Sequence, residues 1–125
     1  ILSSGPAARG GIGYTSGAGA SVTQATNRTT AVTINALCGT ITTNNASLAA
    51  EAAAAFVVNN AAVQIGDCIV LTQRSGAIGV MTDVVVIAVT NGSFTLAVMN
   101  GNVASGTAET GAIILNFAVI KGSTV

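Results

Sequence analysis

The fold of this chain is decided by one stretch in its second half, Asp83-Val84-Val85-Val86-Ile87-Ala88-Val89-Thr90-Asn91-Gly92-Ser93-Phe94-Thr95-Leu96-Ala97-Val98-Met99. Two runs rich in β-branched and aromatic residues flank the dipeptide Asn91-Gly92. Asn-Gly accepts positive φ at both central positions of a two-residue turn, as a type I′ hairpin requires. The stretch therefore predicts a β-hairpin closed by a type I′ turn.

Short apolar runs of strand length recur on both sides of this hairpin, at residues 32–35, 40–42, 56–59, 69–71 and 113–120. In the last run, one face carries Ile113, Leu115, Phe117 and Val119. About seven or eight short strands separated by turn signals are typical of an all-β architecture. We expect an antiparallel β-sandwich or a jelly-roll-like barrel.

The segment 47–55, Ser-Leu-Ala-Ala-Glu-Ala-Ala-Ala-Ala, departs from this β pattern. It has the highest helix propensity in the chain, and Ser47 is suited to be its N-cap. A helix this short is marginal in water. We expect one helical turn or a loop that leads into the strand of Phe56.

Residues 1–20 are rich in glycine and show no periodicity. They predict an extended N-terminal arm at 1–20, followed by a single β-sandwich domain at 21–125. A phosphate-binding loop at 11–16 is disfavoured, because the run lacks a third glycine and follows no strand. The first residues also lack the charged segment and apolar core of a signal peptide.

The composition argues for protein partners. Half of the 125 residues are apolar, only 6% are charged, and the net charge is zero, whereas an ordinary soluble domain carries about 25% charged residues. Without a cationic cluster, binding to nucleic acid or to a membrane surface is not expected. No run reaches the roughly 18 apolar residues of a membrane helix. Because a weakly charged surface resists association poorly, either the chain is very well folded or partners cover its apolar surface.

The chain lacks the groups that catalysis at neutral pH usually requires. It has no histidine, and its four carboxylates are far apart in sequence. We therefore expect no enzyme activity, no cofactor, no metal and no small-molecule substrate. Asp67 is predicted to accept hydrogen bonds within a turn, and Glu109 is predicted to be solvated in a polar loop. Asp83 is placed to pair with Arg74.

The two cysteines, Cys38 and Cys68, lie in apolar, strand-like runs. We expect two buried free thiols, while a single disulfide stays open because sequence does not define its geometry. Two cysteines without histidine do not make a zinc site.

Several predicted strands are apolar on both faces, although a two-layer sandwich covers only the inner face of each sheet. In the hairpin, Val84 and Val86 lie on the opposite face from Val85. In the last strand, Ile114 and Ile120 lie opposite the row of Ile113. Together with residues of the arm, these positions form the predicted interface with a shell or a sister subunit: Arg9, Ile12, Tyr14, Val84, Val86, Ile114 and Ile120.

Three runs of the sequence resemble a group of small virion proteins of tailed bacteriophages. The first contains Gly13-Tyr14, Gly17-Ala18-Gly19 and residues 22–26 (Val-Thr-Gln-Ala-Thr), and the second contains residues 29–35 and 38–42. The third is the ending 114–121 (Ile-Leu-Asn-Phe-Ala-Val-Ile-Lys). The likeness covers most of residues 11–121 and is strongest at the two ends. It implies a β-rich structural protein, of which the capsid decoration (cement) type is the nearest role.

The resemblance also implies partners and a location. Decoration proteins commonly sit as trimers outside the shell, so the expected partners are the major capsid protein and sister copies in a homotrimer. The expected location is the virion surface, after synthesis in the bacterial cytoplasm. Arg9 and Tyr14 are expected to anchor the arm on its partner.

Two other functions compete with capsid decoration. A head-fibre, tail-fibre or receptor-binding module would use exposed loops at 75–79 and 100–111. An enzyme, such as a small polysaccharide-degrading domain, is disfavoured because the usual pair of carboxylates is not signalled.

Overall fold

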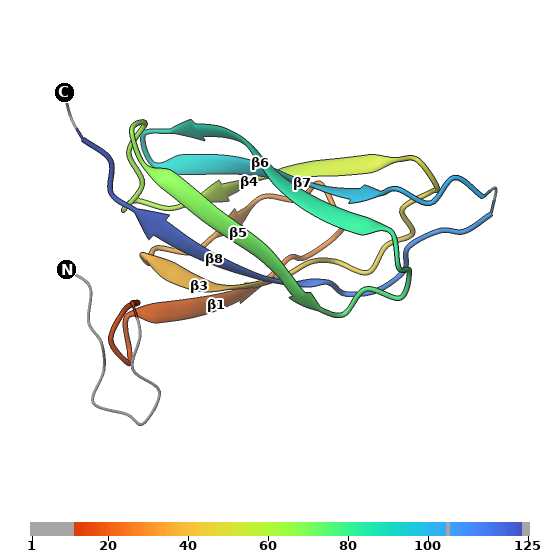
Figure 1. The fold of residues 1–125 in the computed structure, drawn as a ribbon, viewed down its shortest axis with the longest axis horizontal. Coiled ribbons are helices and arrows are strands. Elements are labelled where there is room, and N and C mark those ends of the chain that lie inside the picture. The colour runs from red at the N-terminus through yellow and green to blue at the C-terminus, as the bar shows by residue number, and fades with distance from the viewer. Residues whose placement is uncertain (1–11, 105, 124–125) are drawn as a thin grey trace.

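The computed structural model describes residues 12–104 and 106–123, so Arg9 and most of the predicted arm lie outside the described residues. All regular elements in the described part are β-strands (Figure 1). They are β1 (Gly19–Thr23), β2 (Val32–Thr33), β3 (Cys38–Thr42), β4 (Ala53–Asn59), β5 (Cys68–Ser75), β6 (Thr82–Thr90), β7 (Ser93–Asn100) and β8 (Ile114–Ile120). The prediction of an all-β fold is confirmed.

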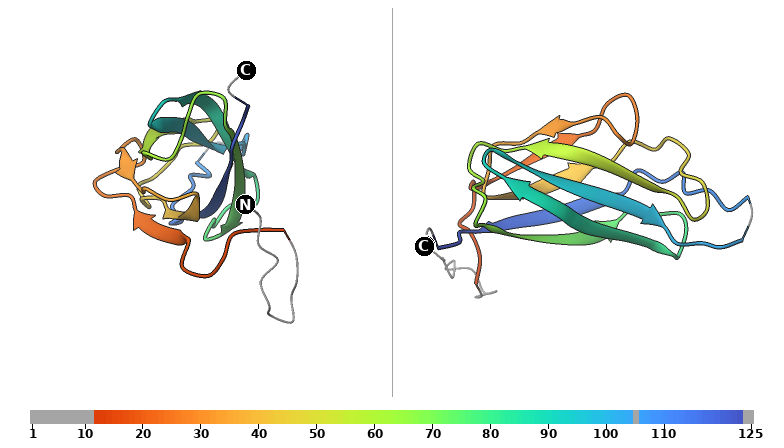
Figure 2. Two further views of the ribbon diagram at one scale, coloured as in Figure 1. Left: turned by 90° about the vertical axis from the view of Figure 1, so that its left-hand side faces the viewer. Right: turned by 90° about the horizontal axis from the view of Figure 1, so that it is seen from above.

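The strands form two four-stranded sheets that face each other (Figure 2). The first sheet has the order β1-β3-β8-β5 and the second the order β2-β4-β7-β6. Because the first four strands alternate between the sheets, strands two apart in sequence become neighbours running in the same direction. β1 is thus parallel to β3, and β2 to β4, while the other pairs are antiparallel. The prediction of a β-sandwich of about seven or eight strands is confirmed, but the sheets are mixed, so the expected antiparallel pairing holds for only part of each sheet.

The core lies between the inner faces of the two sheets. The predicted row on β8 is buried as expected, since Ile113, Leu115 and Val119 are 0% exposed and Phe117 is 3% exposed. The ring of Phe117 packs on Phe94 of the opposite sheet, with ring centroids 5.6 Å apart. These contacts join the sheets through the middle of the sandwich.

The β6–β7 hairpin is confirmed, but its turn differs from the prediction. Gly92 has a φ of 85°, whereas Asn91 does not have positive φ, so the turn is not type I′. The turn is fastened to the β4–β5 connection. The N–H of Gly92 donates to the carbonyl of Val63 at 2.9 Å, and Asn91 Oδ1 accepts from the N–H of Ile65 at 3.0 Å.

The helical alternative for residues 47–55 is wrong, and the loop alternative holds. Leu48 forms an isolated antiparallel bridge with Glu109, and Ala53 already begins β4. Between them, Glu51 has a φ of 61°. Pairing with distant strands has overridden the local helix propensity.

The two ends of the sandwich differ. One, here called the terminal end, holds residues 60–67, the Asn91-Gly92 turn and residues 121–123 (Figure 1). The other, here called the loop end, holds residues 76–81, 101–104 and 106–111.

Candidate functional site

Glu109 organises the loop end from the inside. Its side chain is 1% exposed. Oε1 accepts the N–H of Ile78 at 2.9 Å and of Gly111 at 2.7 Å, and Oε2 accepts the N–H of Gly79 at 2.7 Å. Burial raises the pKa of Glu109, but the three N–H donors and the charge of Arg28 hold it below its ordinary value. The prediction that Glu109 is solvated is wrong, because backbone donors replace the water.

Arg28 is the second buried charge at this end, with 5% exposure. Its guanidinium donates to the carbonyl of Ala46, to Thr43 Oγ1 at 3.3 Å, and to the carbonyls of Glu109 at 3.2 Å and Gly111 at 2.9 Å. Burial lowers the pKa of Arg28, and the charge of Glu109 opposes that effect. The two side chains therefore cross-link four segments of the chain: that of Arg28, residues 43–46, residues 78–79 and residues 109–111.

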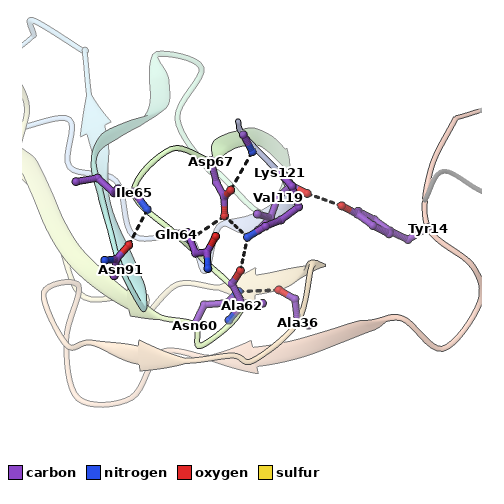
Figure 3. A network of polar contacts seen from close by, with 11 residues as sticks. Tyr14, Ala36, Asn60, Ala62, Gln64, Ile65, Asp67, Asn91, Val119 and Lys121 are labelled. Atoms are coloured by element: carbon purple, nitrogen blue, oxygen red, sulfur yellow. Dashed lines mark hydrogen bonds and ion pairs between the residues drawn. The ribbon is translucent and has the colours of Figure 1, made fainter. Parts of the chain in front are cut away.

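Asp67 has the corresponding role at the terminal end (Figure 3). Oδ2 accepts the N–H of Gln64 at 2.8 Å and Lys121 Nζ at 2.5 Å, while Oδ1 accepts the N–H of Gly122 at 3.0 Å. Lys121 Nζ also donates to the carbonyl of Ala62 at 2.7 Å. The hydrogen bond from Lys121 is the largest cause that lowers the pKa of Asp67, to about 2. The prediction of Asp67 as a turn acceptor is confirmed.

The described part of the chain has one ion pair, between Lys121 and Asp67. The predicted pair of Arg74 with Asp83 is not formed. Asp83 Oδ1 instead accepts the N–H of Val84 at 2.8 Å, on its own strand. Asp83 thus bonds to the backbone of the next residue and not to Arg74 across the loop.

The outer face of the second sheet is mostly apolar across three adjacent strands, with Thr95 as a polar residue between Val57 and Ala88. Register places Ala55, Ala97 and Val85 side by side. Val57 is 37% exposed, Val85 39% and Ile87 55%. Of the residues in β4, β6 and β7, all of them described, only Asp83 is charged. This surface is called the outer apolar face, and it consists of Ala53, Ala55, Val57, Val85, Ile87, Ala88, Ala97 and Met99.

A second group of exposed apolar side chains lies at the loop end. Val80 is 90% exposed, Val103 78%, Ile78 70% and Met81 55%. The N–H of Gly101 donates to the carbonyl of Met81 at 2.8 Å, which holds the two loops together. These four side chains are called the aliphatic tip.

The structure turns the predicted interface residues of β6 inward. Val84 packs against the core, and Val86 pairs with the buried Leu96 on the same inward face. A bulge lies between Val86 and Ala88, so that two residues oppose Thr95 and the alternation changes beyond it. Val84 and Val86 face inward before the bulge, and the outward residues are Val85, Ile87 and Ala88. The bulge places Val89 inward against the core, although simple alternation would put it on the face of Val85.

The other predicted interface residues are placed differently. Ile120 is 55% exposed and Ile114 is half-buried, both on the outer face of the first sheet. Ile12 is 85% exposed. Tyr14 is half-buried, and its hydroxyl donates to the carbonyl of Val119 (Figure 3), so it lies on its own domain. β1 begins at Gly19, inside the predicted arm.

Both cysteines are free, as expected, but Cys68 is exposed and Cys38 is half-buried, so the prediction of two buried thiols is wrong. They lie on β5 and β3, on opposite sides of β8. Neighbouring strands are about 4.8 Å apart, so two strands separate the Cα atoms by more than the roughly 7 Å that a disulfide spans. A bond within the chain is excluded.

No family model, curated protein or solved structure matches this chain. Its function must be argued from its own surface. Both oxygens of Glu109 and of Asp67 are occupied by donors, so these carboxylates hold loops in place. Within residues 12–104 and 106–123, no three potential metal ligands gather. The same residues contain no helix long and apolar enough to cross a membrane.

Sequence reasoning found neither the Arg28–Glu109 cluster nor the aliphatic tip. Arg28 stands in a run of Asn and Thr that resembles an ordinary polar loop. Its carbonyl partners at Glu109 and Gly111 are 81 and 83 residues away. The only signal for the tip is the position of Ile78 between Gly76 and Gly79, within the predicted loop at 75–79.

Proposed function

We propose that this chain is a structural protein of a tailed-phage particle, which decorates the outside of the capsid and stabilises the shell through protein–protein contacts. The observation that carries the proposal is the outer apolar face, which has no charged residue except Asp83 at one end. A contiguous exposed apolar surface that spans three strands marks an interaction site in a soluble protein. The likeness of residues 11–121 to phage virion proteins supports the choice of partner.

The mechanism is associative. Sister copies bury the outer apolar face, and each Å² of apolar surface removed from water contributes about 25 cal/mol. Assembly as a homotrimer gives each particle-bound unit several contacts with the major capsid protein, and linked contacts bind much more tightly than one alone. Binding across the junctions between capsid subunits adds interface area to the shell.

A receptor-binding or fibre module is the second candidate. One observation favours it, because the predicted contact loops at 75–79 and 100–111 lie at the same end of the sandwich and expose Ile78 and Val103. Such a module would act at a few positions of the virion, whereas a decoration protein covers the shell.

Copy number separates these candidates. We would purify the virions whose genome encodes the chain and measure its amount relative to the major capsid protein by quantitative mass spectrometry. Near-stoichiometric copies are expected. A few copies per particle would replace the decoration proposal with the fibre module, and absence from the particles would overturn any role in the virion.

The stabilising role has its own test. Shells that lack the chain should lose their contents at a lower temperature than complete virions, and adding the purified protein should raise that temperature to the value for complete virions. If a saturating amount of the purified protein leaves the release temperature of these shells unchanged, the chain does not stabilise the shell.

A further inference from the structure

We infer that the aliphatic tip is the part of the molecule that docks on the shell, where it enters an uncharged depression lined by aliphatic side chains of the shell protein. This inference rests on the proposed function, since it names the end of the sandwich that meets the capsid. The tip consists of Ile78, Val80, Met81 and Val103, at 55% to 90% exposure.

The first argument is the cost of exposing these side chains. Val80 is 90% exposed, more than any other large apolar residue in the described part of the chain. Single exposed apolar residues are common on protein surfaces, but four on two adjoining loops form a patch. Burial in a partner would recover the apolar surface that the folded chain leaves in water.

The second argument is that the loops are held in place. Glu109 receives three backbone N–H groups, two of them from Ile78 and Gly79 within the first loop. The N–H of Gly101 ties the second loop to Met81. A chain with only eight charged residues buries two of them, Glu109 and Arg28, at this end. Loops ordered before binding lose less entropy on docking.

The third argument concerns charge and identifies the partner as protein. Among residues 76–81, 101–104 and 106–111, Glu109 is the only charged side chain, and it faces inward. Arg28 at this end is buried, and the exposed Arg74 at the end of β5 is offset by the exposed Glu51 and Asp83, so this end has no net positive charge to attract anionic lipid headgroups. It also lacks the Trp and Tyr that favour a membrane interface. A neutral, aliphatic tip complements a neutral, aliphatic depression on a protein.

The fourth argument is geometric. The strands β4, β6 and β7, which carry the outer apolar face, run along the flank of the sandwich, and the loops that carry the tip lie at its end (Figure 1). In a ring of copies packed through their flanks, with the rotation axis along the strands, all tips point to the same side. Several tips would then reach the shell together and bind with avidity.

The experiment uses shells that lack the chain, isolated from particles in which its gene is disrupted. Purified full-length protein is titrated onto these shells, and the bound fraction is measured by co-sedimentation. The variants are Ile78→Ser and the double change Val80→Ser with Val103→Ser. Ile65→Ser is the matched control, because Ile65 is 70% exposed like Ile78 but lies at the terminal end.

We expect the dissociation constant to rise about tenfold for Ile78→Ser, and more for the double variant, from the loss of buried aliphatic surface. Ile65→Ser should bind like the unchanged protein. If the unchanged protein binds shells and the tip variants bind equally well, the inference is overturned while the proposed function stands. If the unchanged protein does not bind shells at all, the proposed function is overturned together with the inference.

Two further measurements exclude the other occupants. Tip variants that become monomeric in size-exclusion chromatography with light scattering would identify the tip as a contact between copies and overturn the inference. The inference is also overturned if the unchanged protein binds vesicles of phosphatidylcholine and phosphatidylglycerol and the tip variants do not, because the tip would then be a membrane contact. Shell binding that depends on the tip, with unchanged oligomeric state and no vesicle binding, supports the inference.

Discussion

The carboxylate of Glu109 lies directly against the backbone of Gly79. Oε2 accepts the N–H of Gly79 at 2.7 Å, and a Cβ placed on Gly79 would lie 3.0 Å from the same oxygen. The loop at 76–81 therefore closes on the carboxylate at a position where a side chain would crowd it. The loop end is built around a buried negative charge, and its conformation depends on that charge.

Replacing Glu109 with Gln should lower the free energy of unfolding by about 2–3 kcal/mol, because an NH₂ group would replace one oxygen that accepts backbone N–H donors. Arg28 would also lose its buried counter-charge. Urea unfolding followed by circular dichroism measures the change. Glu51→Gln is the control, since Glu51 is exposed, and it should change stability little. Equal effects of the two substitutions would contradict the role given to Glu109.

Stability should fall in acid as Asp67 takes up a proton. Its pKa is lowered from 3.8 to about 2 in the folded chain, chiefly by the hydrogen bond from Lys121. Because the folded state binds this proton more weakly, the stabilisation is present above the unfolded pKa and is lost as the pH falls from about 4 to about 2. The lowered pKa of Glu109 acts in the same direction.

The acid effect is tested by thermal unfolding between pH 6 and pH 2. Asp67→Asn should be less stable than the unchanged protein at pH 6 and should lose less stability between pH 4 and pH 2. Lys121→Gln should behave similarly, because it removes the donor that lowers the pKa of Asp67. Arg74→Gln removes a cation from an exposed site and is the control. If the melting temperature of Asp67→Asn falls with pH in parallel with that of the unchanged protein, proton uptake by Asp67 does not cause the loss of stability in acid.

Two glycines with similar φ should respond differently to alanine. Gly76 has a φ of 91° and Gly92 a φ of 85°. A Cβ at Gly92 meets nothing within 4 Å, whereas one at Gly76 would lie 2.1 Å from the carbonyl oxygen of Ala112. Gly92→Ala should cost about 1–2 kcal/mol from backbone strain alone. Gly76→Ala should cost at least about 1 kcal/mol more, because backbone must also move. If urea unfolding gives the same loss of free energy of unfolding for Gly76→Ala and Gly92→Ala, the predicted clash with Ala112 is wrong.

Local patterns in the sequence were sufficient to locate most strands. Alternation at residues 32–35 and 56–59 marks buried and exposed faces directly, because side chains of a strand point alternately to its two sides. The hairpin position followed from Asn91-Gly92 and the turn role of Asp67 from its place after Gly66. Each of these features depends on residues only a few positions apart.

The remaining features depend on contacts between distant residues. Periodicity does not specify which strands become neighbours, so the parallel pairs β1–β3 and β2–β4 were missed. The bulge between Val86 and Ala88 leaves no mark in an unbroken apolar run, and it changes which valines face outward. The bonds of Arg28 to the 109–111 loop join segments about 80 residues apart.

The outer apolar face should mediate contact between copies, and Ile87 tests it. Ile87→Asp places a charge in that face, which should convert the oligomer to monomers because a carboxylate cannot be buried there without a partner. Ile120→Asp is the matched control, since both residues are 55% exposed but Ile120 lies on the other sheet. Analytical ultracentrifugation measures the assembly state, and thermal unfolding checks that both variants fold. Dissociation by Ile120→Asp alone would contradict this assignment and place the contact between copies on the first sheet. Dissociation by Ile87→Asp alone would leave the outer face of the first sheet, with Ile120 and Cys68, open to solvent or to the shell.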